Sequence, residues 1–287
     1  MVRHMDAKHE SLLDDMREKL VADRRSPATV REYLFLSRLF LQFTNKHPNE
    51  CSEKDIEKFK FFLATEKNYS KGSQYLAIKA VRCMYRVLGV DVPKNLVPPR
   101  RARKIPVYLN GSEISVLLDA SKDDITLNSM VNLLIYTGMR VSEMCSLRTD
   151  SVDLASGSIR IENGKGDKER IVLIPENVSG ILKKYMEWRI EKGRVGDFLF
   201  LSRKKGKYST VSVERMIREL SREAGINRKV TPHTLRHTFA TTILKNGGDI
   251  RFIQKLLGHS SIGTTEIYTH IDDETMRDMY SRFRPRF

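Results

Sequence analysis

The sequence SIRIENGKGDKERIVLI occupies residues 158–174. Polar and apolar residues alternate over 158–161, turn-forming residues gather at 163–167, and residues 171–174 are all apolar. An alternating segment, a glycine-containing turn and a second apolar segment together predict an antiparallel β-hairpin. Because the patterns on both sides are helical, this hairpin decides the fold class of the second half: mostly α, with a small antiparallel β-sheet.

Helical patterns surround the hairpin from residue 110 to the C-terminus. Apolar residues recur at helical spacing, and Gly138 and Gly225 are typical helix ends. The expected elements are helices around 114–118 and over 130–136, the hairpin, a helix over 178–191, a short strand at 198–201, a helix over 213–220, further helices after 231, and a short C-terminal helix containing Met276 and Met279. We assign residues 110–287 to one larger domain.

The first 95 residues show only helical patterns. Ser26-Pro27 is typical of a helix start, and Ser52 with Asp55 resembles a capping box. Apolar residues at helical spacing continue this pattern over 12–20 and 75–88. The chain is therefore predicted to be mainly α overall, with residues 1–95 forming a small N-terminal helical bundle.

A basic, proline-rich segment at 96–109 separates the two predicted domains. Its prolines rule out a regular helix, and its cations are Arg100, Arg101, Arg103 and Lys104. An ordinary solvated linker would look similar. Its position between two basic halves favours contact with DNA phosphates.

The composition favours a polyanionic partner. The 287 residues include 51 Lys and Arg against 36 Asp and Glu, a net charge of +15. Nucleic acid is the first candidate, although basic proteins also arise for solubility alone. Three widely spaced cysteines support neither a disulfide framework nor a cysteine zinc site. No segment is typical of a signal peptide or membrane span, so a cytoplasmic protein without a membrane partner is expected.

Two basic residues near the hairpin are candidates for phosphate chemistry. Arg140 lies in TGMRVSE (137–143), where one predicted helix ends and the next begins. An arginine there can bind phosphate through paired N–H groups, and Glu143 is either its salt-bridge partner or the residue that orients it. Lys165, in the hairpin turn, is flanked by glycines. The segment lacks the P-loop spacing, so ATP is not implied.

The remaining candidates follow residue 231. His233 and Arg236 lie three residues apart, on one face of a predicted helix after Pro232. His233 and His237 could instead bind zinc, but the catalytic glutamate of HExxH is absent and no cysteine is near, so no metal is predicted. His259 follows a helix end at Gly258, and Tyr268 lies nine residues further on.

In chain order the candidates are Arg140, Lys165, His233, Arg236, His259 and Tyr268. With this set the sequence resembles the tyrosine recombinase (phage integrase) family, and it is most similar to the short Xer site-specific recombinases of bacteria and archaea. The resemblance is carried by TGMRVSEM, GKGDKER, HTLRH and LGHSSIGTTEIYTH, between about residues 110 and 270. It implies a SAM-like core-binding domain followed by a catalytic domain.

The resemblance also implies an enzyme, a DNA strand transferase that forms a 3′-phosphotyrosine on Tyr268 and needs no metal, ATP or other cofactor. A tyrosine with a pKa near 10 requires a base, for which His233 is the candidate. Lys165 is the candidate acid for the leaving 5′-oxygen. Arg140 and Arg236 would bind the non-bridging oxygens, with His259 as a further donor.

The implied partner is double-stranded DNA carrying a dif-like site with inverted half-sites. Four protomers would act on two such sites, and the free protein would be a monomer or dimer. Chromosome dimer resolution, linked to chromosome partition and cell division, is the leading role. A plasmid or viral integrase, a type IB topoisomerase and a non-catalytic DNA-binding protein remain alternatives. The C-terminal helix could pack on its own domain or on a neighbour.

Overall fold

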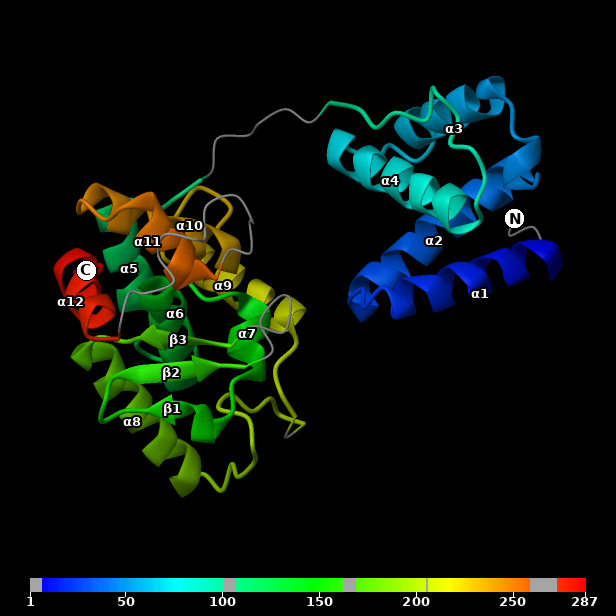
Figure 1. Ribbon diagram of the computed structural model, residues 1–287. Coiled ribbons are helices and arrows are strands. Elements are labelled where there is room, and N and C mark those ends of the chain that lie inside the picture. Colours follow the sequence, from blue (N-terminus) through cyan, green and yellow to red (C-terminus); the bar gives the residue numbers. More distant parts are fainter. Residues whose placement is uncertain (1–6, 101–106, 163–168, 205, 259–272) are drawn as a thin grey trace. The chain divides into compact units, whose positions relative to one another are not determined.

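The computed structural model describes residues 7–100, 107–162, 169–204, 206–258 and 273–287 (Figure 1). The chain divides into two compact units, residues 1–104 and 105–287. Several of the candidates lie outside the described residues: Arg101, Arg103, Lys104, Lys165, His259 and Tyr268.

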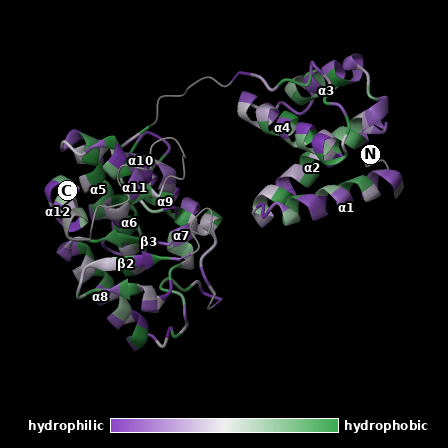
Figure 2. Cartoon of the chain, viewed as in Figure 1, coloured by the Kyte–Doolittle hydropathy of each residue, from purple (hydrophilic) through white to green (hydrophobic). Residues whose placement is uncertain are grey.

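The first unit is a helical bundle. Its elements are α1 (Ala7–Ala22), α2 (Pro27–Thr44), a 3-10 turn at Pro48–Glu50, α3 (Glu53–Thr65) and α4 (Lys71–Val87). The Ser26 side chain accepts a hydrogen bond from the Thr29 N–H at the start of α2, and Ser52 forms the predicted capping box with Asp55. Figure 2 shows hydrophilic and hydrophobic residues interspersed along α1 and α4, as amphipathic helices require.

One apolar core holds this bundle together. Phe40 and Phe59 are fully buried and meet edge to face, with ring centroids 5.0 Å apart. Leu96, at the start of the proline-rich segment, is also buried in this core. The segment therefore begins as part of the first unit, whereas its last residue, Leu109, is buried in the core of the second.

The second unit contains the predicted hairpin within a three-stranded antiparallel sheet, in the order β1-β2-β3. The strands are β1 (Val152–Asp153), β2 (Ser158–Ile161) and β3 (Arg170–Leu173). In the register of β2 and β3, Ile161 lies opposite Arg170 and Ile159 opposite Val172. Val172 is buried and Ile171 exposed, so Arg170 and Val172 share the inward face.

The rest of the unit is helical (Figure 1). Its helices are α5 (Gly111–Ala120), α6 (Ile125–Thr137), α7 (Val141–Ser146), α8 (Glu176–Glu191), α9 (Thr210–Glu223), α10 (Pro232–Lys245), α11 (Ile250–Leu257) and α12 (Asp273–Phe283). From Ser129 to Thr137 every residue of α6 is buried, which makes it the central helix of the unit. No helix among the described residues is long and apolar enough to cross a membrane.

The strand predicted at 198–201 is not formed as a regular strand. Phe198 and Leu201 make only isolated bridges, to Arg148 and Lys207. The Leu199 carbonyl instead accepts hydrogen bonds from the Tyr185 hydroxyl and the Arg189 guanidinium of α8. The run therefore pairs only briefly, where the Leu199 N–H donates to the Leu147 carbonyl, and it is buried against α8.

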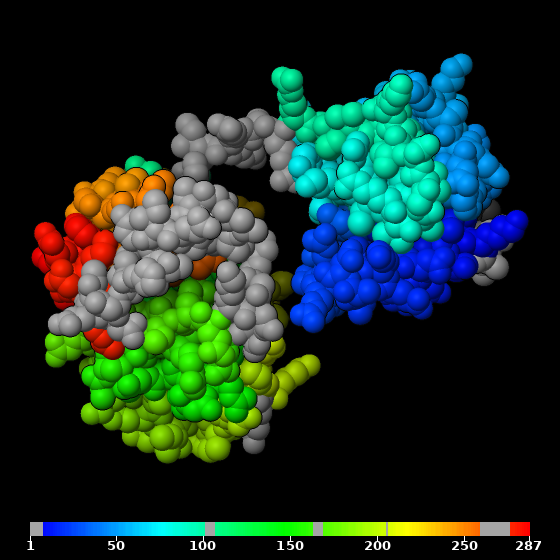
Figure 3. All heavy atoms as spheres, viewed as in Figure 1, coloured from blue at the N-terminus to red at the C-terminus, as the bar shows by residue number. Residues whose placement is uncertain are grey.

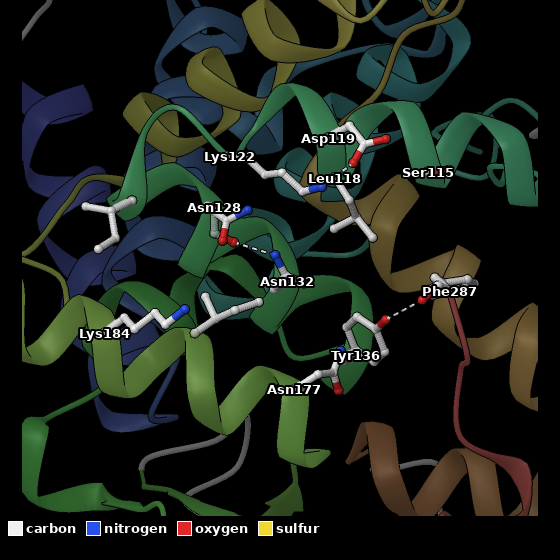
Figure 4. A pocket seen from close by; sticks show the side chains of 12 residues that line it. Ser115, Leu118, Asp119, Lys122, Asn128, Asn132, Tyr136, Asn177, Lys184 and Phe287 are labelled. Atoms are coloured by element: carbon white, nitrogen blue, oxygen red, sulfur yellow. Dashed lines mark hydrogen bonds and ion pairs between the residues drawn. The ribbon is translucent and has the colours of Figure 1, made fainter.

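Helix α12 packs on its own unit. Tyr280, Met276 and Met279 join the apolar cluster of α10 and α11, and the C-terminal residues lie beside these helices in Figure 3. The Tyr280 hydroxyl donates to the Tyr136 carbonyl at 2.9 Å. The chain then ends at a cavity of about 550 Å³, where the Tyr136 hydroxyl donates to the Phe287 carbonyl (Figure 4).

Candidate active site

Arg140 is placed by the tight turn between α6 and α7. Helix α6 ends at Gly138, whose φ of 61° is a left-handed conformation that favours glycine. A Cβ on Gly138 would lie 2.4 Å from Phe239 Cδ1 and 2.9 Å from Leu257 Cδ2, so the residue is also required sterically. The turn leaves Arg140 at the N-cap of α7, with 28% of its side chain exposed.

Arg236 connects three segments of the unit from within. It lies on α10 and is buried, with 6% of its surface exposed. Its Nη1 donates to the Gly138 carbonyl at 2.6 Å and its Nη2 to the Leu257 carbonyl at 2.8 Å. The same guanidinium therefore fixes the turn before Arg140 and the end of α11.

The end of α11 also receives Arg140. Arg140 Nη2 donates to the Gly258 carbonyl at 3.3 Å. The carbonyls at a helix C-terminus carry partial negative charge, which suits them to arginine donors. Two arginines distant in sequence thus meet at Leu257 and Gly258, directly before the segment that contains His259 and Tyr268.

Glu143 lies beneath Arg140, and its side chain is 6% exposed. One carboxylate oxygen accepts from Arg140 Nη1 at 2.8 Å, and the other accepts from the Arg140 backbone N–H at 2.7 Å. Arg170 donates to both oxygens, through Nη1 at 2.9 Å and Nη2 at 2.8 Å. Glu143 is thus both the partner of Arg140 and a residue that orients it.

The charges of this cluster change the pKa values of its members. Burial alone would raise the pKa of Glu143, but the bonds from Arg170 and Arg140 lower it to about 2. Burial, followed by the charge of Arg140, lowers the pKa of Arg236 to about 10. Three arginines against one glutamate leave a net positive site, which favours an anion.

The histidines of α10 lie at its first turns. His233 is exposed, and its ring packs edge to face against His237, with centroids 4.4 Å apart. Burial, then the nearby His233 and Arg236, lowers the pKa of His237. His233 and Arg236 share α10, but one is exposed and the other buried.

Arg170 is a residue of this cluster that the sequence patterns did not single out. It directly precedes the apolar run of the predicted hairpin, and a strand alternates its faces with period two. Arg170 precedes Val172 by two residues, so this alternation puts both residues on the same, buried face of the strand. A buried cation requires a partner, so the pattern contained the signal.

Comparison with known proteins covers both units. The model of the phage integrase family matches residues 108–275, and that of the phage integrase N-terminal SAM-like domain matches residues 12–93. The tyrosine recombinase XerA of Thermococcus kodakarensis is 35% identical over 275 residues, 93% of each chain.

Two solved structures are also similar. A crystal structure of XerA recombinase shares 47% identity, with a TM-score of 0.53 over 97% of this chain and 100% of that one. A structure of XerH site-specific recombinase bound to its difH substrate has a TM-score of 0.69 at 22% identity, covering 91% of this chain and 82% of that one. The second likeness shows a shared fold.

Proposed function

The chain belongs to the phage integrase family and is a tyrosine recombinase of Xer type, and from this premise we propose that it cleaves and rejoins duplex DNA through Tyr268. Tyrosine recombinases are DNA strand-transferring enzymes. The observation that carries the proposal for this site is the meeting of Arg140 and Arg236 at the end of α11. Tyr268 follows Gly258 by ten positions along the chain.

After their contacts with described residues, the two guanidiniums have further donors that could bind a phosphate. A guanidinium has five N–H groups. Toward described residues, the Arg140 side chain uses one N–H for Glu143 and one for Gly258, and Arg236 uses one each for Gly138 and Leu257. Donors that remain can hold the non-bridging oxygens as negative charge builds during attack.

We assign the proton transfers to His233 and Lys165. The Tyr268 oxygen attacks phosphorus and the bond to the 5′-oxygen breaks, which leaves a 3′-phosphotyrosine and a 5′-hydroxyl. His233 is exposed on α10 and would take the tyrosine proton. Lys165 would protonate the leaving oxygen, and His259 would donate to the phosphate. The covalent bond conserves the phosphodiester, so the reaction requires no ATP.

We further propose that the substrate is a dif-like site with inverted half-sites, on which four protomers join two DNA segments. The support is the Xer type of the chain and its shared fold with XerH, a recombinase solved in complex with a difH substrate. Basic residues of the proline-rich segment, beginning with exposed Arg100, would contact the DNA backbone. Helix α12 packs in cis here. We propose that during assembly this helix docks on a neighbouring protomer.

The test is to trap the covalent protein–DNA complex on a nicked duplex. The nick lets the short cleaved fragment dissociate, so that religation is prevented. The wild-type protein should form a denaturation-resistant adduct in EDTA, because arginines and lysine supply the charge that metal ions supply elsewhere. Tyr268→Phe should bind the same duplex with similar affinity and form no adduct. An adduct with Tyr268→Phe would move the nucleophile to another tyrosine. Recombination between two sites, compared with relaxation of a single-site circle, separates a recombinase from a topoisomerase.

A further inference from the structure

The strongest unassigned feature is the contact between Arg170 and Glu143. We infer that Arg170 is a positioning residue, which holds Glu143 so that the Arg140 guanidinium stays available to the scissile phosphate. The inference rests on the proposed function, because it concerns the same phosphate clamp. It adds a residue from the first position of β3, five residues after Lys165 in the sequence.

The hydrogen bonds of Glu143 are shared evenly between two arginines. An ionised carboxylate offers about four acceptor positions. Arg170 takes two with its planar Nη pair, while the Arg140 backbone N–H and Nη1 take the others. The Glu143 carboxylate is therefore saturated, and each arginine occupies a fixed position on it.

Saturation matters because Glu143 and a phosphate compete for Arg140. A carboxylate with open acceptor positions prefers the bidentate pairing that arginine offers. If Arg170 were absent, Glu143 would have room to take both Nη groups of Arg140, and the Nη2 contact with Gly258 would be lost. The guanidinium would then face Glu143 in place of the DNA.

The surroundings of Arg170 leave it few other positions. Its side chain is 13% exposed, and it contacts Gly258, where an added Cβ would lie 3.1 Å from its Cδ, Nε and Nη1. It lies opposite Ile161, in the last strand pair before the hairpin turn. Arg170 thus connects the turn end of the hairpin strands, the Arg140 segment and the end of α11.

The experiment measures single-turnover cleavage of the nicked duplex by the full chain. Arg170→Gln should slow cleavage by about 10–100-fold, the range seen when a supporting partner of a metal ligand is removed. Arg170→Lys keeps the charge but cannot make the bidentate contact, so it should recover only part of the rate. Arg148→Gln is the matched control, since Arg148 also pairs with two carboxylates, Asp150 and Asp197, but is exposed. Its rate should stay unchanged.

A second substrate distinguishes a loss of Arg140 positioning from a general loss of structure in the Arg170 variant. A methylphosphonate at the scissile position removes the negative charge that Arg140 binds. If Arg170 acts through that clamp, the rate difference between wild type and Arg170→Gln should shrink on this neutral substrate. If Arg170→Gln does not fold, the same comparison is made with Arg170→Lys. Equal losses on both substrates, or no loss on either, would overturn the inference. A wild-type protein that forms no adduct would instead refute the proposed function.

Discussion

Arg140 and Arg236 share one proposed task but are held in different ways. Arg236 is buried and donates to two backbone carbonyls, whereas Arg140 is partly exposed and paired with a carboxylate that has a second partner. The two residues should therefore contribute differently to stability and similarly to chemistry.

Removing each arginine tests this difference. Arg236→Ala leaves the Gly138 and Leu257 carbonyls without a donor, at a cost of about 1–3 kcal/mol each in the free energy of unfolding. Arg140→Ala leaves Glu143 bound to Arg170 and should cost about 1 kcal/mol or less. Both should lose about a hundredfold in cleavage rate. Urea unfolding and adduct formation give the two values; equal destabilisation would contradict the assignment.

Glu143 should make the stability of the protein depend on acidity. Its pKa is about 2 in the folded protein and 4.5 ordinarily. A lowered folded-state pKa stabilises the fold above pH 4.5, and this contribution is lost as the pH falls toward 2. The wild-type protein should therefore lose on the order of 3 kcal/mol over that interval that Glu143→Gln does not lose. Urea midpoints at pH 6, 4 and 3 check this; parallel pH curves for the two proteins would exclude it.

At this scale the sequence singles out candidate residues but does not predict how they are held. Arg140, Glu143 and Arg236 were recognisable from motifs because their types and spacing are local. Their meeting at Leu257 and Gly258 depends on long-range packing, which spacing cannot encode. Arg170 was overlooked because the strand was predicted from its apolar residues alone.

At the scale of elements, the hairpin and the run at 198–201 show where sequence patterns succeed. The hairpin has alternation and a turn between two paired segments, so its register follows from local signals. The run at 198–201 has only apolar character, which any buried segment shares. Side chains of α8 satisfy its Leu199 carbonyl, and nothing in the run itself predicts that.

The turn between α6 and α7 should tolerate no side chain at Gly138. Gly138→Ala combines a positive φ with a Cβ inside contact distance of Phe239 and Leu257. The backbone conformation should cost about 1 kcal/mol and the overpacking a further ~1–3 kcal/mol, so the protein should be destabilised by more than about 2 kcal/mol. The variant should also cleave DNA more slowly, because Arg140 is displaced. Gly225→Ala is the control, since Gly225 has φ +71° but open space around it. It should show only the backbone penalty of about 1 kcal/mol. Thermal unfolding of the two variants separates the backbone cost from the overpacking cost. Equal changes in melting temperature would show that the close contacts at Gly138 relax without cost.

At the scale of the whole molecule, each unit has its own apolar core. Residues 1–104 and 105–287, produced separately, should therefore each unfold cooperatively. If the two units are independent, thermal melting monitored by circular dichroism should show one cooperative transition for each fragment.

The net charge of +15 bears on how these units bind DNA together. Phosphate contacts release counterions, so the logarithm of affinity falls with the logarithm of salt concentration by a slope proportional to the contacts made. If both units contact the duplex, the slope of the full chain should approach the sum of the two separate slopes. Its affinity should also exceed that of the better unit by about 10²–10⁴, because the covalent connection makes the second contact intramolecular. Fluorescence anisotropy titrations at several salt concentrations measure both quantities. A single unit that reproduces the slope and affinity of the full chain would show that the other unit does not bind DNA.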